Sequence, residues 1–198
     1  MNPLERTVLR YLGYNLKNID ETKTPLTALI KEVNEAKDLL SKTEPKYVTG
    51  IWDCVVNEDT ISFGGQKIKS SALAEHMKDA VIIGLIAVTL GTQADMLIQR
   101  YSVTNIKKSA IINSVASVTA NDACKKAEAE LRAHPDLIGF PAYKRFSPGF
   151  GDFDLSNQEV IIQMLDANKR IGLSLTADNM LVPTKSVTAV VGFYWETM

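Results

Sequence analysis

The stretch that decides the fold is Ala80-Val81-Ile82-Ile83-Gly84-Leu85-Ile86-Ala87-Val88-Thr89-Leu90, an apolar run broken only by Gly84 and Thr89. A membrane-spanning helix needs roughly 18 or more apolar residues, so this run is too short to cross a bilayer. A strand that is covered on both faces loses the alternation of apolar and polar residues. The run therefore predicts a strand buried on both faces, and a buried helix is the alternative.

Two amphipathic helices are expected before this strand. Asn2 can cap the first helix, Pro3 suits its first turn, and Gly13 suits its exit. A second helix opens at Thr24, and its apolar stripe ends before Pro45. The amino-terminal part of the chain, residues 1–45, is therefore predicted to be helical.

Strand-forming residues follow these helices. Residues 47–56 and 60–63 are rich in β-branched and aromatic side chains, and turn residues lie between them and after them. This order favours a β-meander. Ser71 is the expected cap of a short helix that reaches Met77 and leads into the apolar strand.

A long helix is expected at the centre of the chain. Thr92 and Asp95 resemble a capping box and open a helix over about 93–101. Residues 105–132 then support a long helix, with apolar residues spaced along it, which His134-Pro135-Asp136 terminates. We expect this helix to form the spine of the core.

The last quarter begins with a loop over 141–154 that is dense in glycine, proline and aromatic residues. Ser156 and Glu159 form the sequence signature of a capping box for the next helix. Apolar residues alternate over 171–175 and again over 187–193, which predicts two strands. The expected fold is thus one α+β domain over residues 1–198: amino-terminal helices, then a core over 46–198 with a twisted, mainly antiparallel sheet and a long central helix.

Composition excludes several classes of protein. Of 198 residues, 45% are apolar and 23% are charged, which is typical of a globular protein and not of a disordered one. With 22 basic and 23 acidic residues, the net charge is -1, which argues against a nucleic-acid partner. The amino terminus shows no signal-peptide pattern and no run is long enough for a membrane span. We expect a cytoplasmic location without membrane association.

The familiar catalytic constellations are absent from the sequence. It contains no phosphate-binding Walker loop and no nucleophile elbow. His76 and His134 stand alone, without a second histidine or a cysteine at ligand spacing. Cys54 and Cys124 are expected to be packing residues. We predict neither a catalytic side chain nor a protein-held metal.

Two loops can bind a ligand. In Arg145-Phe146-Ser147-Pro148-Gly149-Phe150-Gly151-Asp152, the arginine offers a fork for a carboxylate or phosphate, and the two phenylalanines could wall a flat heterocycle. The alternative is a tight turn whose arginine pairs with a surface carboxylate. Lys185 and Ser186 stand at the mouth of the last strand, where they could contact an anionic group; the alternative is a solvated loop.

Several motifs, taken in order along the chain, carry a resemblance to a known family. They are residues 7–14 (Thr-Val-Leu-Arg-Tyr-Leu-Gly-Tyr), 89–91, 145–152, 155–158, 171–176 and 182–192. Together they resemble the activation (reactivation) domain of vitamin B12-dependent methionine synthase, in its free-standing bacterial form. The resemblance covers nearly the whole chain, and its carboxyl-terminal motifs are specific in combination.

The resemblance implies a site for S-adenosylmethionine. It assigns the methionine carboxylate to Arg145 and loop contacts to Ser147, Pro148, Gly149 and Phe150. It also places Lys185 and Ser186 in a second matching motif at the site.

The implied function is that of an activation component. The family uses S-adenosylmethionine to remethylate a cobalamin carried by a partner, after a flavodoxin-type donor has re-reduced the oxidised cobalt. The expected partners are therefore a corrinoid-carrying methionine synthase chain and such a donor. Orienting a methyl group requires no general base, which agrees with the missing catalytic constellations.

Two departures from the family keep an alternative open. Phe150 stands where the family usually has tyrosine, and Asn121 (or its neighbour Asp122) aligns near a usual glutamate. The alternative is a drifted member that binds or scaffolds a corrinoid protein without S-adenosylmethionine. A third possibility is a self-sufficient methyltransferase for a small molecule, which the absence of a general base disfavours.

Overall fold

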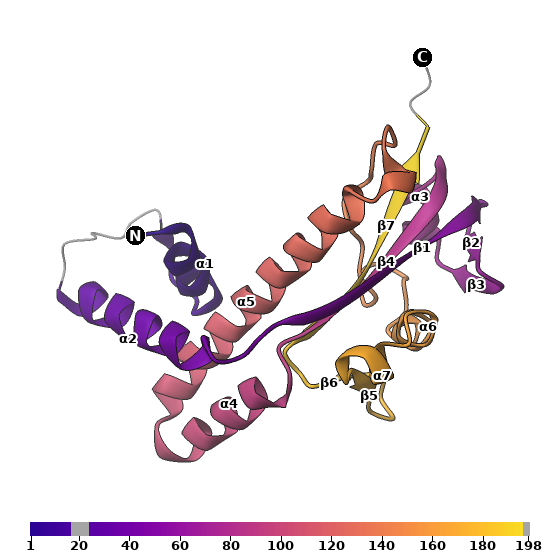
Figure 1. Ribbon diagram of the computed structural model, residues 1–198. Coiled ribbons are helices and arrows are strands. Elements are labelled where there is room, and N and C mark those ends of the chain that lie inside the picture. The colour runs from indigo at the N-terminus through magenta and orange to yellow at the C-terminus, as the bar shows by residue number, and fades with distance from the viewer. Residues whose placement is uncertain (17–23, 196–198) are drawn as a thin grey trace.

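The apolar run at 80–90 forms strand β4 (Ala80–Thr89), which lies inside an antiparallel sheet (Figure 1). The computed structural model describes residues 1–16 and 24–195. The other strands of this sheet are β1 (Lys46–Val56), β2 (Thr60–Phe63), β3 (Gln66–Lys69) and β7 (Ser186–Tyr194). Their order is β3-β2-β1-β4-β7, so β4 is flanked by the two other long strands, each antiparallel to it. The expected mainly antiparallel sheet is confirmed.

Helices cover both faces of this sheet. The long helix α5 (Ile106–Arg132) crosses one face, while α6 (Asn157–Met164) and α7 (Ala167–Ile171) lie over the other (Figure 1). Helix α3 (Ser71–His76) packs in the same core as α6 and α7. Ile86 and Val88 of β4 pack with the α5 side, whereas Ile83 and Leu85 pack in the core on the opposite face. Because successive side chains of a strand point to opposite faces, a strand covered on both faces requires a nearly continuous apolar run. The prediction of a strand buried on both faces is confirmed, and the helical alternative is wrong.

The amino-terminal helices build a second core around α5, beyond the end of the sheet. Helices α1 (Pro3–Tyr11), α2 (Thr24–Leu40) and α4 (Thr92–Thr104) lie against its amino-terminal half (Figure 1). Asn2 caps α1 through a reciprocal pair: its side chain accepts from the Glu5 N–H, and the Glu5 carboxylate accepts from the Asn2 N–H. The predicted cap is thus confirmed. Asn105 also caps α5 through its side chain, which accepts from the Lys108 N–H at 3.0 Å.

The predicted capping box at Thr92 is wrong. Helix α4 begins after Gly91, whose φ of +76° suits glycine, and no side chain caps the helix. The Asp95 carboxylate accepts instead from the backbone N–H and the hydroxyl of Thr184, both at 2.7 Å. A tertiary contact to the loop before β7 therefore replaces the local one.

Two other expected caps also differ. The Ser156 backbone is already helical, so its side chain makes no capping bond; the Asp154 carboxylate accepts from the Ser156 N–H at 2.8 Å. Helix α3 is capped by Ser70, not Ser71: the Ser70 hydroxyl accepts from the Leu73 N–H at 3.0 Å. The sequence alone cannot tell which of two neighbouring serines caps a helix, because the cap is the one whose backbone is still extended.

The strand expected over 171–175 is mostly wrong. Ile171 ends helix α7, Gly172 follows it at φ +72°, and only β5 (Ser174–Leu175) is a strand, paired with β6 (Leu181–Val182) in a separate hairpin. Ile171 and Leu173 are both buried in the core under the sheet, so their alternation reflects the end of a helix and a loop. Strand β3 was not predicted, because Ile68 is its single apolar residue.

Candidate functional site

The segment 141–149 lies along the outer edge of β7, which sets the direction of its side chains. The Phe146 N–H donates to the Val190 carbonyl, and the Val190 N–H donates back, both at 2.8 Å. The Tyr143 N–H donates to the Gly192 carbonyl at 2.9 Å. In such a ladder neighbouring side chains point to opposite faces. Arg145 is therefore directed towards α5, and Phe146 towards the opposite side of the sheet.

Arg145 is held against α5. Its Nη1 donates to Oε2 of Glu128 at 3.0 Å, and its Nη2 approaches Oδ1 of Asn121 at 3.4 Å. One quarter of the Arg145 side chain is exposed. The turn alternative, in which this arginine pairs with a carboxylate, is thus correct about the pairing. The partner is not a surface carboxylate, however: the Glu128 side chain is only 16% exposed and lies on the central helix α5.

Lys185 reaches the same face of α5 from the start of β7. Its Nζ donates to the Ser117 hydroxyl at 3.3 Å, one helical turn before Asn121. Partial burial lowers the pKa of the Lys185 ammonium, and the charge of Asp95 opposes that shift. Arg145 and Lys185, with Ser117, Asn121 and Glu128 of α5, are called the cationic row below.

The other loop residues predicted for the site make contacts that hold the loop in its conformation. The Ser147 hydroxyl donates to the Thr188 carbonyl at 2.7 Å, which fixes the loop to β7. Gly149, at φ +93°, follows Pro148 and donates its N–H to the Phe153 carbonyl at 2.7 Å. The left-handed backbone at this turn favours glycine.

The two aromatic residues expected to wall a heterocycle lie away from the cationic row. Phe146 packs in the core on the face opposite α5, with its ring centroid 6.2 Å from that of Phe153 and 5.1 Å from that of His76. Phe150 meets Phe146 edge to face at 6.2 Å and is 64% exposed. The expected aromatic wall is therefore on the wrong side of the sheet edge to face the Arg145 guanidinium.

Ser186 is also engaged within the protein. Its hydroxyl lies 2.8 Å from the Thr89 hydroxyl and donates to the Pro183 carbonyl at 2.7 Å. Of the residues predicted for the site, the structure thus brings Arg145 and Lys185 together on α5.

Sequence reasoning named Asn121 of α5 as a departure from the family but missed Ser117 and Glu128 on the same helix. Glu128 accepts from Arg132 as well as from Arg145, and the Asn121 amide donates to the Tyr11 hydroxyl of α1 at 3.2 Å. Asn121 also borders a cleft of about 280 Å³ between α1 and α5, lined by Leu4, Thr7, Tyr11, Val118 and Lys125 among others. The i, i+4 spacing of Glu128 and Arg132 was visible in the sequence, but it indicates an ion pair along a helix rather than a ligand site.

The cysteines and histidines have structural contacts. Burial raises the pKa of the Cys54 thiol to about 11 and also raises that of Cys124, so neither is an activated nucleophile. His76 Nε2 lies 2.7 Å from the Lys144 carbonyl, and His134 Nδ1 accepts from the Asp136 N–H at 3.3 Å. Within residues 1–16 and 24–195, no group of three or more histidine, cysteine, aspartate or glutamate side chains could hold a metal ion. No helix in the described ranges is long and apolar enough to cross a membrane.

Comparison with known proteins adds a structural likeness. No protein-family model matches the sequence, and no curated protein does. The chain does resemble the crystal structure of the MetH reactivation domain bound to AdoHcy, with a TM-score of 0.73 and 15% identity. The match covers 98% of this chain and 76% of the other. The chain has the reactivation-domain fold.

The likeness confirms the fold that the motifs implied. Because it spans nearly all of the chain, it includes the amino-terminal helices, the antiparallel sheet, α5 and the loop that carries Arg145. At 15% identity the reactivation-domain fold is what the two structures share, and the role of each side chain in this chain depends on its own contacts.

Proposed function

We propose that this chain binds S-adenosylmethionine at the cationic row and acts as the activation component of a corrinoid-dependent methionine synthase. A separate chain would carry the cobalamin, and a flavodoxin-type donor would supply the electron. The proposal is supported by the motifs in the sequence and by a fold shared with a domain that binds AdoHcy.

The observation that carries the proposal is the presentation of Arg145. A guanidinium has five N–H donors, of which Glu128 and Asn121 take one each. Among the described residues, no acceptor engages its Nε–H. The Nε–Nη2 edge is the geometry that binds a carboxylate through two parallel hydrogen bonds, as the amino-acid end of S-adenosylmethionine requires.

Lys185 and Asn121 supply further polar groups next to that edge. The Lys185 ammonium is a donor for a hydroxyl or ring nitrogen of a nucleoside, and Oδ1 of Asn121 is an acceptor for the ligand ammonium. When bound, S-adenosylmethionine supplies an electrophilic methyl group. The residues of this chain would hold and orient it towards the acceptor on the partner, which is catalysis by proximity.

A second candidate function is a corrinoid-protein binding module that has lost the ligand. It is favoured by the hydrogen bonds of Glu128, the carboxylate of the cationic row, because both of its oxygens already accept from arginines. The cationic end of S-adenosylmethionine would therefore meet only the neutral amide of Asn121 there. The exposed Phe150 also lacks the hydroxyl of the usual tyrosine.

Thermal unfolding with and without excess S-adenosylmethionine distinguishes the two functions. Ligand at 100 times its dissociation constant should add about 2.7 kcal/mol to the free energy of unfolding. Arg145→Ala should abolish the shift, whereas Arg100→Ala, which removes an exposed arginine on α4 outside the cationic row, should retain it. No shift of the wild-type protein at millimolar ligand would refute S-adenosylmethionine binding. Capture of a corrinoid-carrying methionine synthase chain, independent of ligand, would then support the second function.

A further inference from the structure

Glu128 lies between two arginines. Its Oε2 accepts from Nη1 of Arg145 at 3.0 Å, and its Oε1 accepts from Nε and Nη2 of Arg132 at 3.1 and 2.7 Å. The exposed fractions of the three side chains are 16% for Glu128, 25% for Arg145 and 35% for Arg132. These residues form what we call the Arg–Glu–Arg triad. It is shielded enough that its geometry is more constrained than that of an exposed ion pair.

The triad fixes the segment 141–149 to α5 at two points. Besides its bonds to Glu128, Nη2 of Arg132 donates to the Tyr143 carbonyl at 2.9 Å. Tyr143 and Arg145 belong to the same extended segment beside β7. One end of the triad thus holds the backbone of the segment, and the other end holds its arginine side chain.

The pattern of bonds leaves one side of Arg145 available. Glu128 occupies Nη1, and the contact between Nη2 and Asn121, at 3.4 Å, is long for a hydrogen bond. A carboxylate that approaches the Nε–Nη2 edge therefore displaces at most one weak bond. If Glu128 bound the Nε–Nη2 edge, it would compete with such a ligand.

The net charge of the triad also favours the binding of a carboxylate at Arg145. Two guanidiniums and one carboxylate carry a net charge of +1, so Arg132 prevents Glu128 from cancelling the charge of Arg145. We propose that Glu128 and Arg132 are positioning residues: Glu128 orients the Arg145 guanidinium, and Arg132 preserves its attraction for one carboxylate. The identity of the ligand rests on the proposed function, whereas the orientation of Arg145 does not.

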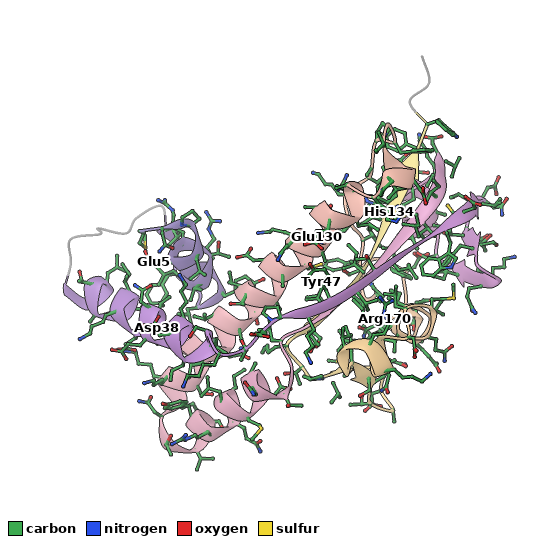
Figure 2. All side chains as sticks on the ribbon, viewed as in Figure 1. Glu5, Asp38, Tyr47, Glu130, His134 and Arg170 are labelled. Atoms are coloured by element: carbon green, nitrogen blue, oxygen red, sulfur yellow. The ribbon has the colours of Figure 1, made fainter. Side chains whose placement is uncertain are left out.

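The test is Glu128→Gln, which retains the size of the side chain but removes its charge and places an N–H₂ group against an arginine. Glu130→Gln is the matched control, because Glu130 lies two residues further on α5 and accepts from the Tyr47 hydroxyl (both labelled in Figure 2). Glu128→Gln raises the net charge of the triad from +1 to +2, which by itself would favour a carboxylate, so a loss of affinity would report the lost orientation of Arg145. Binding of S-adenosylmethionine and S-adenosylhomocysteine should weaken about tenfold in Glu128→Gln and stay unchanged in the control. Tighter binding in Glu128→Gln would show that Glu128 competes with the ligand, and unchanged binding would show that it has no role; either result overturns the proposal.

A second readout needs no ligand. In ¹⁵N NMR spectra of the wild-type protein, the side-chain N–H signals of Arg145, assigned by their loss in Arg145→Lys, should be resolved because the guanidinium is held. They should broaden or merge in Glu128→Gln and persist in Glu130→Gln. If the wild-type protein binds neither ligand, the proposed function fails, but these signals still decide whether Glu128 orients Arg145. Averaged signals in the wild-type protein would refute the positioning role.

Arg132→Gln tests the charge of the triad together with the Arg132 bond to the Tyr143 carbonyl, while it leaves the bond between Glu128 and Arg145 in place. In this variant Glu128 still holds Arg145, so the Arg145 signals should remain resolved, while the charge of the remaining pair falls to zero. Ligand binding should therefore weaken although the guanidinium stays ordered. Unchanged affinity would refute the role of Arg132. This variant also keeps the proposal testable if Glu128→Gln does not fold.

Discussion

Replacing Gly84 by alanine tests how closely α5 approaches the centre of the sheet. A Cβ atom at this position would lie 2.6 Å from Cδ2 of Leu131 and 3.1 Å from Cε2 of Phe193. Carbon atoms in contact are about 3.5–4.0 Å apart, so the Leu131 methyl group must retreat by about 1 Å. Both neighbours are buried, with 3% and 1% of their surface exposed, so the added atom has little room.

The expected cost follows from two opposing effects. Overpacking a core costs about 1–3 kcal/mol, and removing a glycine from a strand interior returns about 0.5–1 kcal/mol. The difference between these effects is about 0–2.5 kcal/mol, and the approach of 2.6 Å to Leu131 argues against its lower end, so we expect Gly84→Ala to lower the free energy of unfolding by about 1–2 kcal/mol. In a chain of this size that corresponds to a fall in melting temperature of about 2–8 °C. Urea unfolding monitored by circular dichroism would measure the change in the free energy of unfolding.

A double-mutant cycle with Leu131→Ala tests the reasoning. Leu131→Ala alone should cost about 2–5 kcal/mol, because it opens a cavity. In that background Gly84→Ala should be neutral or stabilising, since its methyl group enters the vacated space. Gly192→Ala is the comparison on β7: its nearest atoms, in Met77 and Ala80, would be 3.1 Å away, so a smaller cost is expected. Equal costs of Gly84→Ala in both backgrounds would refute the proposed close approach of Leu131.

Two further predictions concern contacts between distant segments. The Asp152 carboxylate accepts from the Ser70 hydroxyl and from two backbone N–H groups at the start of α3, which lowers its pKa below the ordinary 3.8. The stabilisation it provides over Asp152→Asn should therefore be complete above about pH 5 and shrink as the pH falls through the lowered pKa; a difference in unfolding free energy that is independent of pH would contradict this. Asp95→Ala should cost about 1–3 kcal/mol, because it removes both bonds to Thr184, while Thr92→Ala should change stability by less than about 0.5 kcal/mol, because Thr92 caps no helix. Similar losses in the two variants, measured by urea unfolding, would restore the capping-box interpretation.

Local patterns predicted most of the elements because their cause is local. The apolar run of β4, the cap at Asn2 and the helix begun by Asn105 each depend on neighbouring residues. Some predictions failed because a distant partner took over a local group, and others because a neighbouring residue supplied the cap instead. Asp95 bonds to a loop 89 residues away instead of capping its own helix. Ile171 ends a helix at Gly172, whose φ is +72°, and Ile171 and Leu173 alternate in the sequence because both are buried in one core.

The sequence by itself determined most of the helices and long strands and singled out Arg145 and Lys185, because hydrophobic period, caps and turn residues act over a few positions. Only the tertiary structure decided that these two cations both contact α5, that Phe146 and Phe150 lie on the other side of the sheet edge, and that Glu128 binds Arg145. These contacts join residues 17 to 68 positions apart, and the pairing of the 141–149 segment with β7 sets which side chain faces which way. Side-chain direction at a sheet edge reverses with a one-residue change of register, and pairing partners far along the chain decide that register.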